Sequence, residues 1–169
     1  MQKTILIISG TGMLGQPVAR RLKESGFGVR VMTRNLQKAK EMFDSTYEIF
    51  AGDPTDINCV EEALNGCYGV HISLPSEVEQ QVAETVAQVA SRHGVERISY
   101  ISGATVAEEH RWVPIANRKF LAEQAIRERD SLHHPLPDLG HGDFADVREP
   151  GSGRCFWKAA LSLPLGRCR

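Results

Sequence analysis

The amino-acid sequence predicts a doubly wound α/β fold, in which helices cover both faces of a parallel sheet of about five strands. Short β-branched runs alternate with longer helical patterns over residues 1–129, and such alternation with short loops is typical of right-handed βαβ units. Each short run is apolar and bounded by Gly, Asp, Ser or Pro, as in strands that are buried on both faces. Neither periodicity persists beyond Asp130, so residues 130–169 are expected to form an irregular tail rather than a domain.

The expected elements follow one another along residues 1–129. The predicted strands are Thr4–Ser9, Val29–Thr33, Tyr47–Ala51, Gly69–Ser73 and Arg97–Ser102. The predicted helices are Leu14–Glu24, Leu36–Phe43, Asn58–Leu64, Val78–His93 and Ile115–Arg127. The helix over 78–93 has the clearest pattern, because its Val and Ala residues recur at helical spacing while Glu and Gln occupy the other face.

Composition and charge exclude several classes of protein. The chain of 169 residues has a net charge of −1, so electrostatics give no reason to expect nucleic acid or an anionic membrane as a partner. No apolar run approaches the ~20 residues of a membrane-spanning helix, and the run Ile5–Ile8 is too short for a signal peptide. Cys59, Cys67, Cys155 and Cys168 form no CxxC pair and lack metal-ligand spacing. We therefore expect a cytoplasmic protein with reduced thiols and no metal site.

A glycine-rich motif, GxGxxG, directly follows the first predicted strand at residues 10–15. In such a strand–turn–helix context, the first glycine permits a tight turn and the second lets a pyrophosphate approach the backbone. The third glycine lets the helix pack closely on the strand, and the helix N-terminus presents free N–H groups to the phosphates. The motif therefore predicts a dinucleotide-binding site of the kind found in Rossmann folds; the alternative is a glycine-rich turn without a ligand.

The end of the second predicted strand indicates which dinucleotide binds. A site for NAD(H) places Asp or Glu about 20 residues after the glycines, where it holds the ribose 2′-hydroxyl. Here residues 31–35 read VMTRN, with no acid before Glu41. The guanidinium of Arg34 suits a 2′-phosphate, and Lys38 would add a second charge one helical turn onward. NADP(H) is therefore favoured, with NAD(H) as the alternative; a solvated Arg34 without a ligand is the other interpretation.

Five strings, in order along residues 1–129, resemble the NmrA-like branch of the atypical short-chain dehydrogenases. They read SGTGMLGQPVARRL, VMTRN, GDPTD, VERISYISGAT and NRKFLAEQAI. The resemblance implies a Rossmann fold that binds NADP(H), followed by a smaller substrate lobe. Its functional implications are two: an NAD(P)H-dependent reductase of a small carbonyl, quinone or enone, or a regulator that senses NADP(H) without turnover and acts through a protein partner.

The resemblance also implies which residues hold the cofactor. The pyrophosphate would lie against the glycine motif, formed by Gly10, Thr11, Gly12, Met13, Leu14 and Gly15. The remaining contacts would come from residues that follow the other strands: Thr33, Arg34 and Lys38 for the adenosine ribose and its phosphate, Gly52 and Asp53 for the adenine, and Ser73, Leu74, Pro75 and Lys119 for the nicotinamide ribose. Many relatives have a further glycine where this chain has Ser9, which we expect to be a small departure because serine hydrogen-bonds locally.

The same resemblance leaves catalysis open. In short-chain dehydrogenases a Ser, a Tyr and a Lys four residues after the Tyr form a proton relay. Ser102 and Lys119 stand at the serine and lysine positions and are the candidate catalytic residues, but Ile115 takes the place of the tyrosine. Lys119 would then clamp the ribose or donate the proton itself; the alternative is a solvated lysine. Tyr100 lies within a predicted strand and is expected to belong to the core.

Residues 130–169 depart from the family's continuation, which would add a sixth strand and the substrate lobe. Dropping one base permits FRTLVMETL from residues 136–144 and VFGKQPSPYHWVAA from residues 155–168, and both strings resemble that continuation. We therefore expect a frame change near residue 130, against the alternative of a genuinely divergent tail. On this hypothesis the chain is a fragment that lacks the lobe over the nicotinamide, and full activity is not expected of it.

Overall fold

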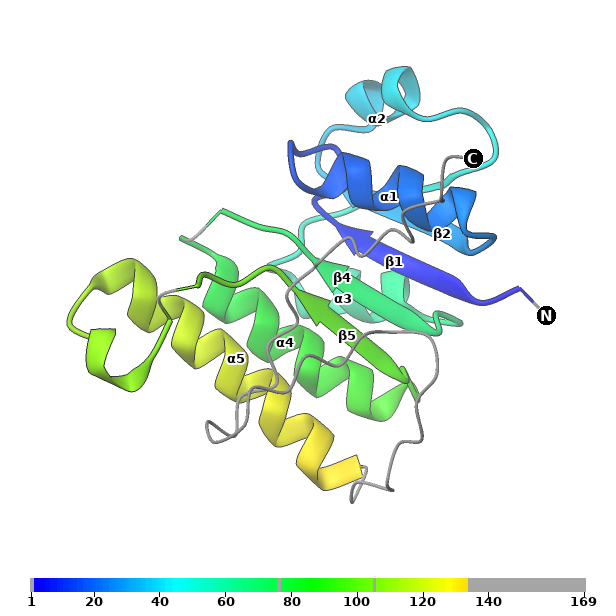
Figure 1. Cartoon of the computed structure of the whole chain (residues 1–169). Coiled ribbons are helices and arrows are strands. Elements are labelled where there is room, and N and C mark those ends of the chain that lie inside the picture. Colours follow the sequence, from blue (N-terminus) through cyan, green and yellow to red (C-terminus); the bar gives the residue numbers. More distant parts are fainter. Residues whose placement is uncertain (1, 76, 105, 134–169) are drawn as a thin grey trace, which may run out of the picture.

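The computed structural model describes residues 2–75, 77–104 and 106–133, with side chains as far as residue 128. Within these ranges, parallel strands form one five-stranded sheet in the order β3-β2-β1-β4-β5 (Figure 1). The strands are β1 (Thr4–Ile8), β2 (Gly28–Thr33), β3 (Glu48–Ala51), β4 (Gly69–Ile72) and β5 (Arg97–Tyr100). The predicted doubly wound α/β fold is confirmed.

Helices cover both faces of this sheet, with α1 and α2 on one face and α3, α4 and α5 on the other (Figure 1). The helices are α1 (Gly15–Glu24), α2 (Leu36–Met42), α3 (Ile57–Leu64), α4 (Glu79–Arg92) and α5 (Pro114–His133), with the 3-10 turn η1 (Glu108–His110) before α5. Among the described helices, none combines the length and apolar character that a membrane crossing requires.

The predicted boundaries agree with the observed elements to within two residues, except at the end of α5. We expected that helix to end at Arg127, but it continues to His133, past the expected domain boundary at 129. The division of the chain at that boundary therefore stays a prediction. The tail over 134–169 and its frame change lie outside the described residues.

The central strand β1 shows how the sheet divides the core in two. Ile5 and Ile7 pack beneath α1 and α2, whereas Leu6 and Ile8 belong to the larger cluster beneath α3, α4 and α5. Successive side chains of a strand point to opposite faces, so a strand covered on both faces must be apolar throughout. This requirement explains the continuous apolar run TILII in β1.

The strand order reverses direction between β1 and β4, which are neighbours at the centre of the sheet. The chain leaves β1 toward β2 and β3 on one side and later returns to β4 and β5 on the other. In open parallel sheets, ligands bind outside the carboxyl ends of the strands at such a switch point. The loops that follow β1, β2, β3 and β4 at this edge contain most of the predicted cofactor-binding residues.

Candidate functional site

The glycine loop, residues 9–15, joins β1 to α1 at the switch point. A Cβ atom added to Gly15 would lie 2.6 Å from the carbonyl oxygen of Ser9 and 2.9 Å from the Cα of Gly10. On Gly10 it would lie 2.8 Å from Cγ1 of Val31. Gly12 is less crowded, its nearest neighbour being the Ser9 carbonyl oxygen at 3.1 Å. Gly10 and Gly15 are therefore required by packing, while Gly12 keeps the backbone of the loop bare.

Ser9 adopts a conformation that the sequence analysis did not anticipate. Its φ is 64°, in the left-handed region where glycine is favoured because a Cβ atom is strained there. Its carbonyl oxygen accepts the Gly12 N–H at 2.9 Å, which closes the turn. The expectation of a small departure at this position is corrected: the turn selects for glycine, and serine is accommodated at a conformational cost.

The N-terminus of α1 faces the same loop. Within the described residues, α1 has no side-chain hydrogen bond at its N-cap, Leu14, and no acidic residue in its first turn. The first N–H groups of a helix lack intrahelical partners and carry a partial positive charge. Because no acidic side chain of that turn competes for these N–H groups, they suit an anion such as a phosphate.

The end of β2 is tied to the glycine loop. Thr33 is buried, and its Oγ1 lies 3.3 Å from Oγ1 of Thr11 in the loop. Thr33 also accepts the N–H of Asn35 at 3.1 Å, and the Asn35 side chain in turn accepts the Lys38 N–H at 2.9 Å at the start of α2. These contacts fix the backbone on both sides of Arg34, whose side chain is exposed. Three predicted residues, Thr11, Thr33 and Arg34, therefore lie together.

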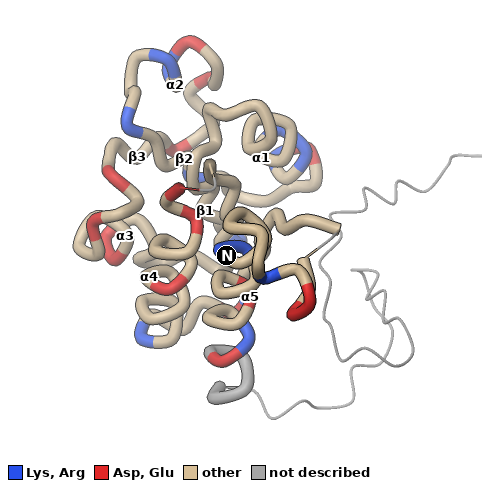
Figure 2. Tube along the Cα trace, turned by 90° about the vertical axis from the view of Figure 1, so that its left-hand side faces the viewer, with Lys and Arg blue, Asp and Glu red and all other residues tan. Residues whose placement is uncertain are grey.

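Asp53 follows β3 at the same edge of the sheet. Its carboxylate accepts the Thr55 N–H at 2.9 Å and the Thr55 hydroxyl at 2.8 Å. These hydrogen bonds, and more weakly the charge of Arg34, hold the pKa of Asp53 below its usual value. Figure 2 shows basic positions on both α1 and α2, the helices that flank this part of the site.

The other half of the candidate site is built around Lys119, on α5. Its Nζ donates to Oε1 of Glu79 at 2.5 Å and to the carbonyl oxygen of Ile101 at 3.2 Å. It also lies 5.4 Å from the centroid of the Tyr100 ring. The Glu79 side chain is only 1% exposed and that of Lys119 19%. An ion pair is thus held inside the protein, where α4, α5 and the end of β5 meet.

Tyr100 lies in the core, as expected, but its hydroxyl belongs to this charged cluster. The hydroxyl oxygen and Oε2 of Glu79 are both buried, and neither has a hydrogen-bond partner among the described residues. Burial, and then the negative charge of Glu79, raise the pKa of Tyr100. Tyr100 is buried and does not line the cavity beside Lys119, so it does not take the place of the tyrosine that is missing at Ile115.

The second candidate catalytic residue, Ser102, has a different partner. Its hydroxyl donates to the carboxylate of Glu123, which also accepts from Arg127 at 3.1 Å. Ser102 and Lys119 therefore lie close to the end of the same strand but in separate hydrogen-bonded groups. The catalytic role predicted for Ser102 stays a prediction.

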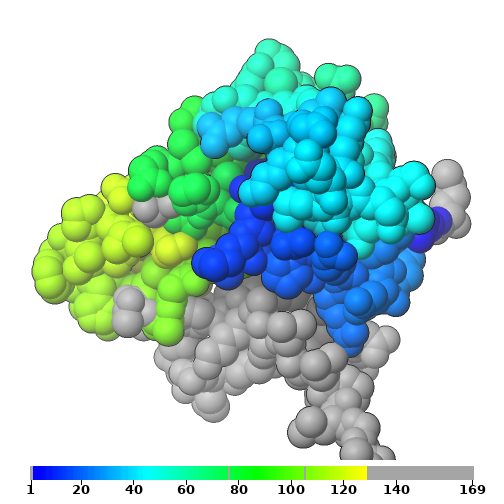
Figure 3. Space-filling model, turned by 90° about the horizontal axis from the view of Figure 1, so that it is seen from above, coloured from blue at the N-terminus to red at the C-terminus, as the bar shows by residue number. Residues whose placement is uncertain are grey.

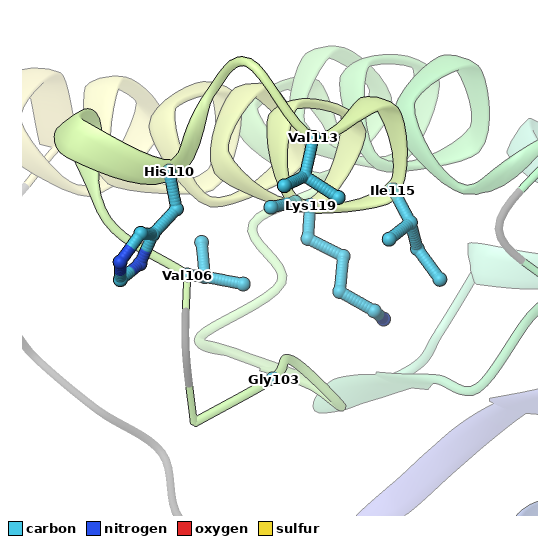
Figure 4. Close-up of a pocket in the computed structure, with 7 residues that line it drawn as sticks. Gly103, Val106, His110, Val113, Ile115 and Lys119 are labelled. Carbon is cyan, nitrogen blue, oxygen red and sulfur yellow. The ribbon is translucent and has the colours of Figure 1, made fainter.

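An open cavity of about 350 Å³ adjoins Lys119, within the size range of small-molecule sites (about 300–1,000 Å³). Its lining comes from the loop after β5, from η1 and from α5: Gly103, Val106, His110, Val113, Ile115, Ala116 and Lys119. In Figure 4, Lys119 extends from α5 beside Ile115, with Nζ pointing away from His110. Figure 3 shows the glycine loop in blue and this segment in yellow-green on the same face of the molecule.

Glu79 is the residue that the sequence analysis missed. The helical pattern assigned Glu and Gln to the outer face of this helix, and for Glu79 that assignment is wrong, because the side chain is buried. The spacing holds a usable signal: Glu79 shares the helix face of the buried residues Val82, Val86 and Ala90. A glutamate on an apolar stripe requires a buried partner, and Lys119 is that partner.

The family of the chain follows from its sequence as a whole. Residues 1–133 match the family model of the NmrA-like family. The chain belongs to the NmrA-like family. The resemblance inferred from the five strings is therefore confirmed, and the observed sheet and glycine loop are those of an NmrA-like protein.

Several relatives of this NmrA-like chain are reductases. The NAD(P)H azoreductase of Xenophilus azovorans is 26% identical over 172 residues, covering 86% of this chain and 59% of the relative. The solved structure of the Citrobacter sp. triphenylmethane reductase complexed with NADP(H) is 26% identical, with a TM-score of 0.64, over 75% of this chain and 46% of that chain. An Escherichia coli NADPH-dependent quinone oxidoreductase complexed with NADPH shares the fold at 23% identity and a TM-score of 0.64, over 74% of this chain and 45% of that chain. This chain spans about half the length of these relatives.

Proposed function

We propose that this protein binds NADP(H) and is a reductase of a small carbonyl, quinone or enone. The observation that carries the proposal is the placement of two features at one edge of the sheet. The glycine loop lies at the switch point beside β4, and Lys119 is held at the end of β5, the next strand. A dinucleotide along this edge spans both features.

The residues present fit NADP(H) at the adenosine end. The pyrophosphate would lie against the bare backbone of the glycine loop and the N-terminus of α1, where a side chain at Gly12 would obstruct it. Arg34, exposed and next to the buried Thr33, would pair with the 2′-phosphate, assisted by Lys38. Gly52 and Asp53 would border the adenine. NAD(H), which lacks the 2′-phosphate, is the weaker alternative.

Lys119 is the residue on which we base the proposed chemistry. When bound, the reduced nicotinamide supplies a hydride. A lysine ammonium has three N–H donors, and Lys119 commits two of them to Glu79 and Ile101. The third donor remains for a ribose hydroxyl or for the oxygen of a substrate in the adjoining cavity, whose lining is mostly apolar. Ser73, Leu74 and Pro75, after β4, would border the same ribose.

The experiment that tests this proposal is a titration of the full chain with NADPH and NADH, followed by NADPH oxidation with a panel of carbonyls, quinones and enones. We expect NADPH to bind more tightly than NADH and at least one compound to be reduced. Lys119→Ala should then abolish reduction. Failure to bind either dinucleotide would overturn the proposal.

One observation favours a second function, that of a regulator that binds NADP(H) without turnover. Ile115 lines the cavity where the family's proton relay has a tyrosine, and the Ser102 hydroxyl is engaged by Glu123. Tight NADPH binding with no reduction across the whole panel would favour this second function. A protein partner would then be expected to bind only one redox state of the cofactor.

A further inference from the structure

We infer that Glu79 is a positioning residue that holds the Lys119 ammonium at the nicotinamide half of the site. This inference rests on the proposed function and deepens it, since it names the residue through which Lys119 acts. Glu79 does not itself line the cavity, but it is paired with Lys119, which does, so its effect on a ligand is expected to pass through Lys119.

The carboxylate of Glu79 is buried to an unusual degree. Glu79 is the first residue of α4 and is 1% exposed, although carboxylates are rarely so buried without a partner. The partial positive charge at the helix N-terminus favours an anion there, and Lys119 supplies the full positive charge at 2.5 Å. The pair joins the beginning of α4 to α5.

The Lys119 ammonium is held by its neighbours. A lysine is a compact charge on a flexible stem of four carbons, so its position depends on what holds it. Here Glu79 and the Ile101 carbonyl oxygen each accept a hydrogen bond from Nζ, and the Tyr100 ring lies beneath it at 5.4 Å. Without the Glu79 charge, one carbonyl and a ring face would remain, and the stem could swing into the cavity.

The two members of the ion pair differ in their exposure to solvent. Glu79 is closed off, while Lys119 keeps 19% of its side chain exposed and lines the cavity. The pair is therefore open to solvent through its lysine and not through its carboxylate. The open end lies on Lys119, on the side where a ligand would bind.

The second oxygen of Glu79, Oε2, is enclosed by the protein as well. Oε2 is buried without a partner among the residues described, and so is the Tyr100 hydroxyl. The negative charge of Glu79 contributes to the raised pKa of Tyr100, so the two groups are close neighbours. Glu79 and Tyr100 both contact Lys119, so the carboxylate, the phenol ring and the ammonium form one group.

The experiment compares two ligands, NADPH and adenosine 2′,5′-bisphosphate, on the full chain. The bisphosphate reaches only the adenosine half of the site, whereas NADPH extends to Lys119. We expect Glu79→Gln to weaken NADPH binding about tenfold, since a charge-assisted contact is lost, and to leave bisphosphate binding unchanged. Glu84→Gln, an exposed acid on the same helix, is the matched control and should change neither affinity.

A double-mutant cycle separates positioning from a structural role. If Glu79 acts through Lys119, adding Glu79→Gln to Lys119→Met should weaken NADPH binding no further. Glu79→Asp keeps the charge but shortens the side chain, and it should restore part of the affinity lost in Glu79→Gln. If Glu79→Gln does not fold, Glu79→Asp carries the same comparison, with a smaller loss for NADPH and none for the bisphosphate.

The outcomes distinguish this inference from the proposed function. Unchanged NADPH affinity in Glu79→Gln, or additive losses in the cycle, would overturn the role of Glu79 while NADP(H) binding stands. Equal losses for NADPH and the bisphosphate would show a general structural effect and would overturn it as well. If the unmodified chain binds neither ligand, the proposed function and this inference fail together.

Discussion

The adenosine half and the Lys119 half of the site are formed by different kinds of structure. The first is a contiguous loop, residues 9–15, that contains three glycines, with the exposed Arg34 beside it. The second is a buried cluster of Glu79, Tyr100 and Lys119, which come from α4, β5 and α5. In the first half the backbone determines the shape, and in the second the charges of distant side chains determine it.

The two halves are therefore sensitive to different kinds of substitution. A backbone cradle fails when a methyl group is added, because interiors are close-packed and close contacts cannot relax freely. A buried ion pair fails when one partner is removed, because the remaining charge is left without compensation. An exposed cation such as Arg34 is screened by water and contributes less than either.

The largest effect is expected at Gly15, in the glycine loop. Gly15→Ala places a Cβ atom 2.6 Å from backbone, so α1 must move away from β1. We expect about 3 kcal/mol less stability in urea denaturation, with loss of NADPH binding. Gly12→Ala, with a closest contact of 3.1 Å, should cost less than about 1 kcal/mol and still abolish NADPH binding. Equal stabilities of the two variants would contradict this division of roles.

A fall in pH should destabilise both halves of the site together, because the same sheet supports both. Burial lowers the pKa of His71, on β4, from 6.5 to about 4. The unfolded chain therefore takes up a proton as the pH falls below about 6.5, while the folded chain does not until about 4. The free energy of unfolding should therefore decrease as the pH falls through this window. At pH 5 the loss due to His71 should be about 2 kcal/mol relative to neutral or higher pH.

The measurement is urea denaturation at pH 8 and pH 5, with binding of NADPH and the bisphosphate followed in parallel. In His71→Leu the part of the pH dependence that comes from the imidazole should disappear. If the stability difference between pH 8 and pH 5 is the same in His71→Leu as in the unmodified chain, the pH dependence does not come from His71.

Arg34 tests whether the adenosine half discriminates between cofactors. Arg34→Glu should weaken NADPH about tenfold, or ~1.4 kcal/mol, because the 2′-phosphate loses a charged partner and meets a carboxylate. NADH affinity should change by less than about twofold. Parallel titrations check this, with Lys40→Glu, an exposed cation of α2, as the control. Equal weakening of both cofactors would refute the role given to Arg34.

The smallest effect is expected at Ser9, and it has the opposite sign. Ser9→Gly removes the strain of a side chain at a φ of 64°, at the expense of a more flexible unfolded chain. The net result should be a gain of about 0.5–1 kcal/mol in thermal or urea unfolding. NADPH affinity should not fall. A loss of stability would show that the serine hydroxyl contributes more than the backbone strain costs.

The same contrast explains what could be predicted from the sequence. The strands and most helices were predictable because periodicity is a local property, and the glycine loop because its residues are contiguous. Lys119 was found through its family position. The strain at Ser9 was missed because the residue type alone does not determine the backbone φ angle.

Glu79 was missed for a different reason. Its partner lies on another helix, and a pattern within one helix does not show which partner is near. The helix signal alone assigned it to solvent, whereas tertiary packing against Tyr100 and Lys119 buries it. A polar residue on an apolar stripe was the one available indication.

The parallel register of β1 has a consequence for the order in which the protein folds. Ile7 pairs in register with Val31 of β2, close along the chain, and with His71 of β4, much farther along it. Contacts between distant segments form more slowly, because a longer loop must close first. The β1–α1–β2 unit that holds the glycine loop can therefore assemble before β4 and β5 dock. On this order, the glycine loop forms early in folding, and the cluster that holds Lys119 is completed last.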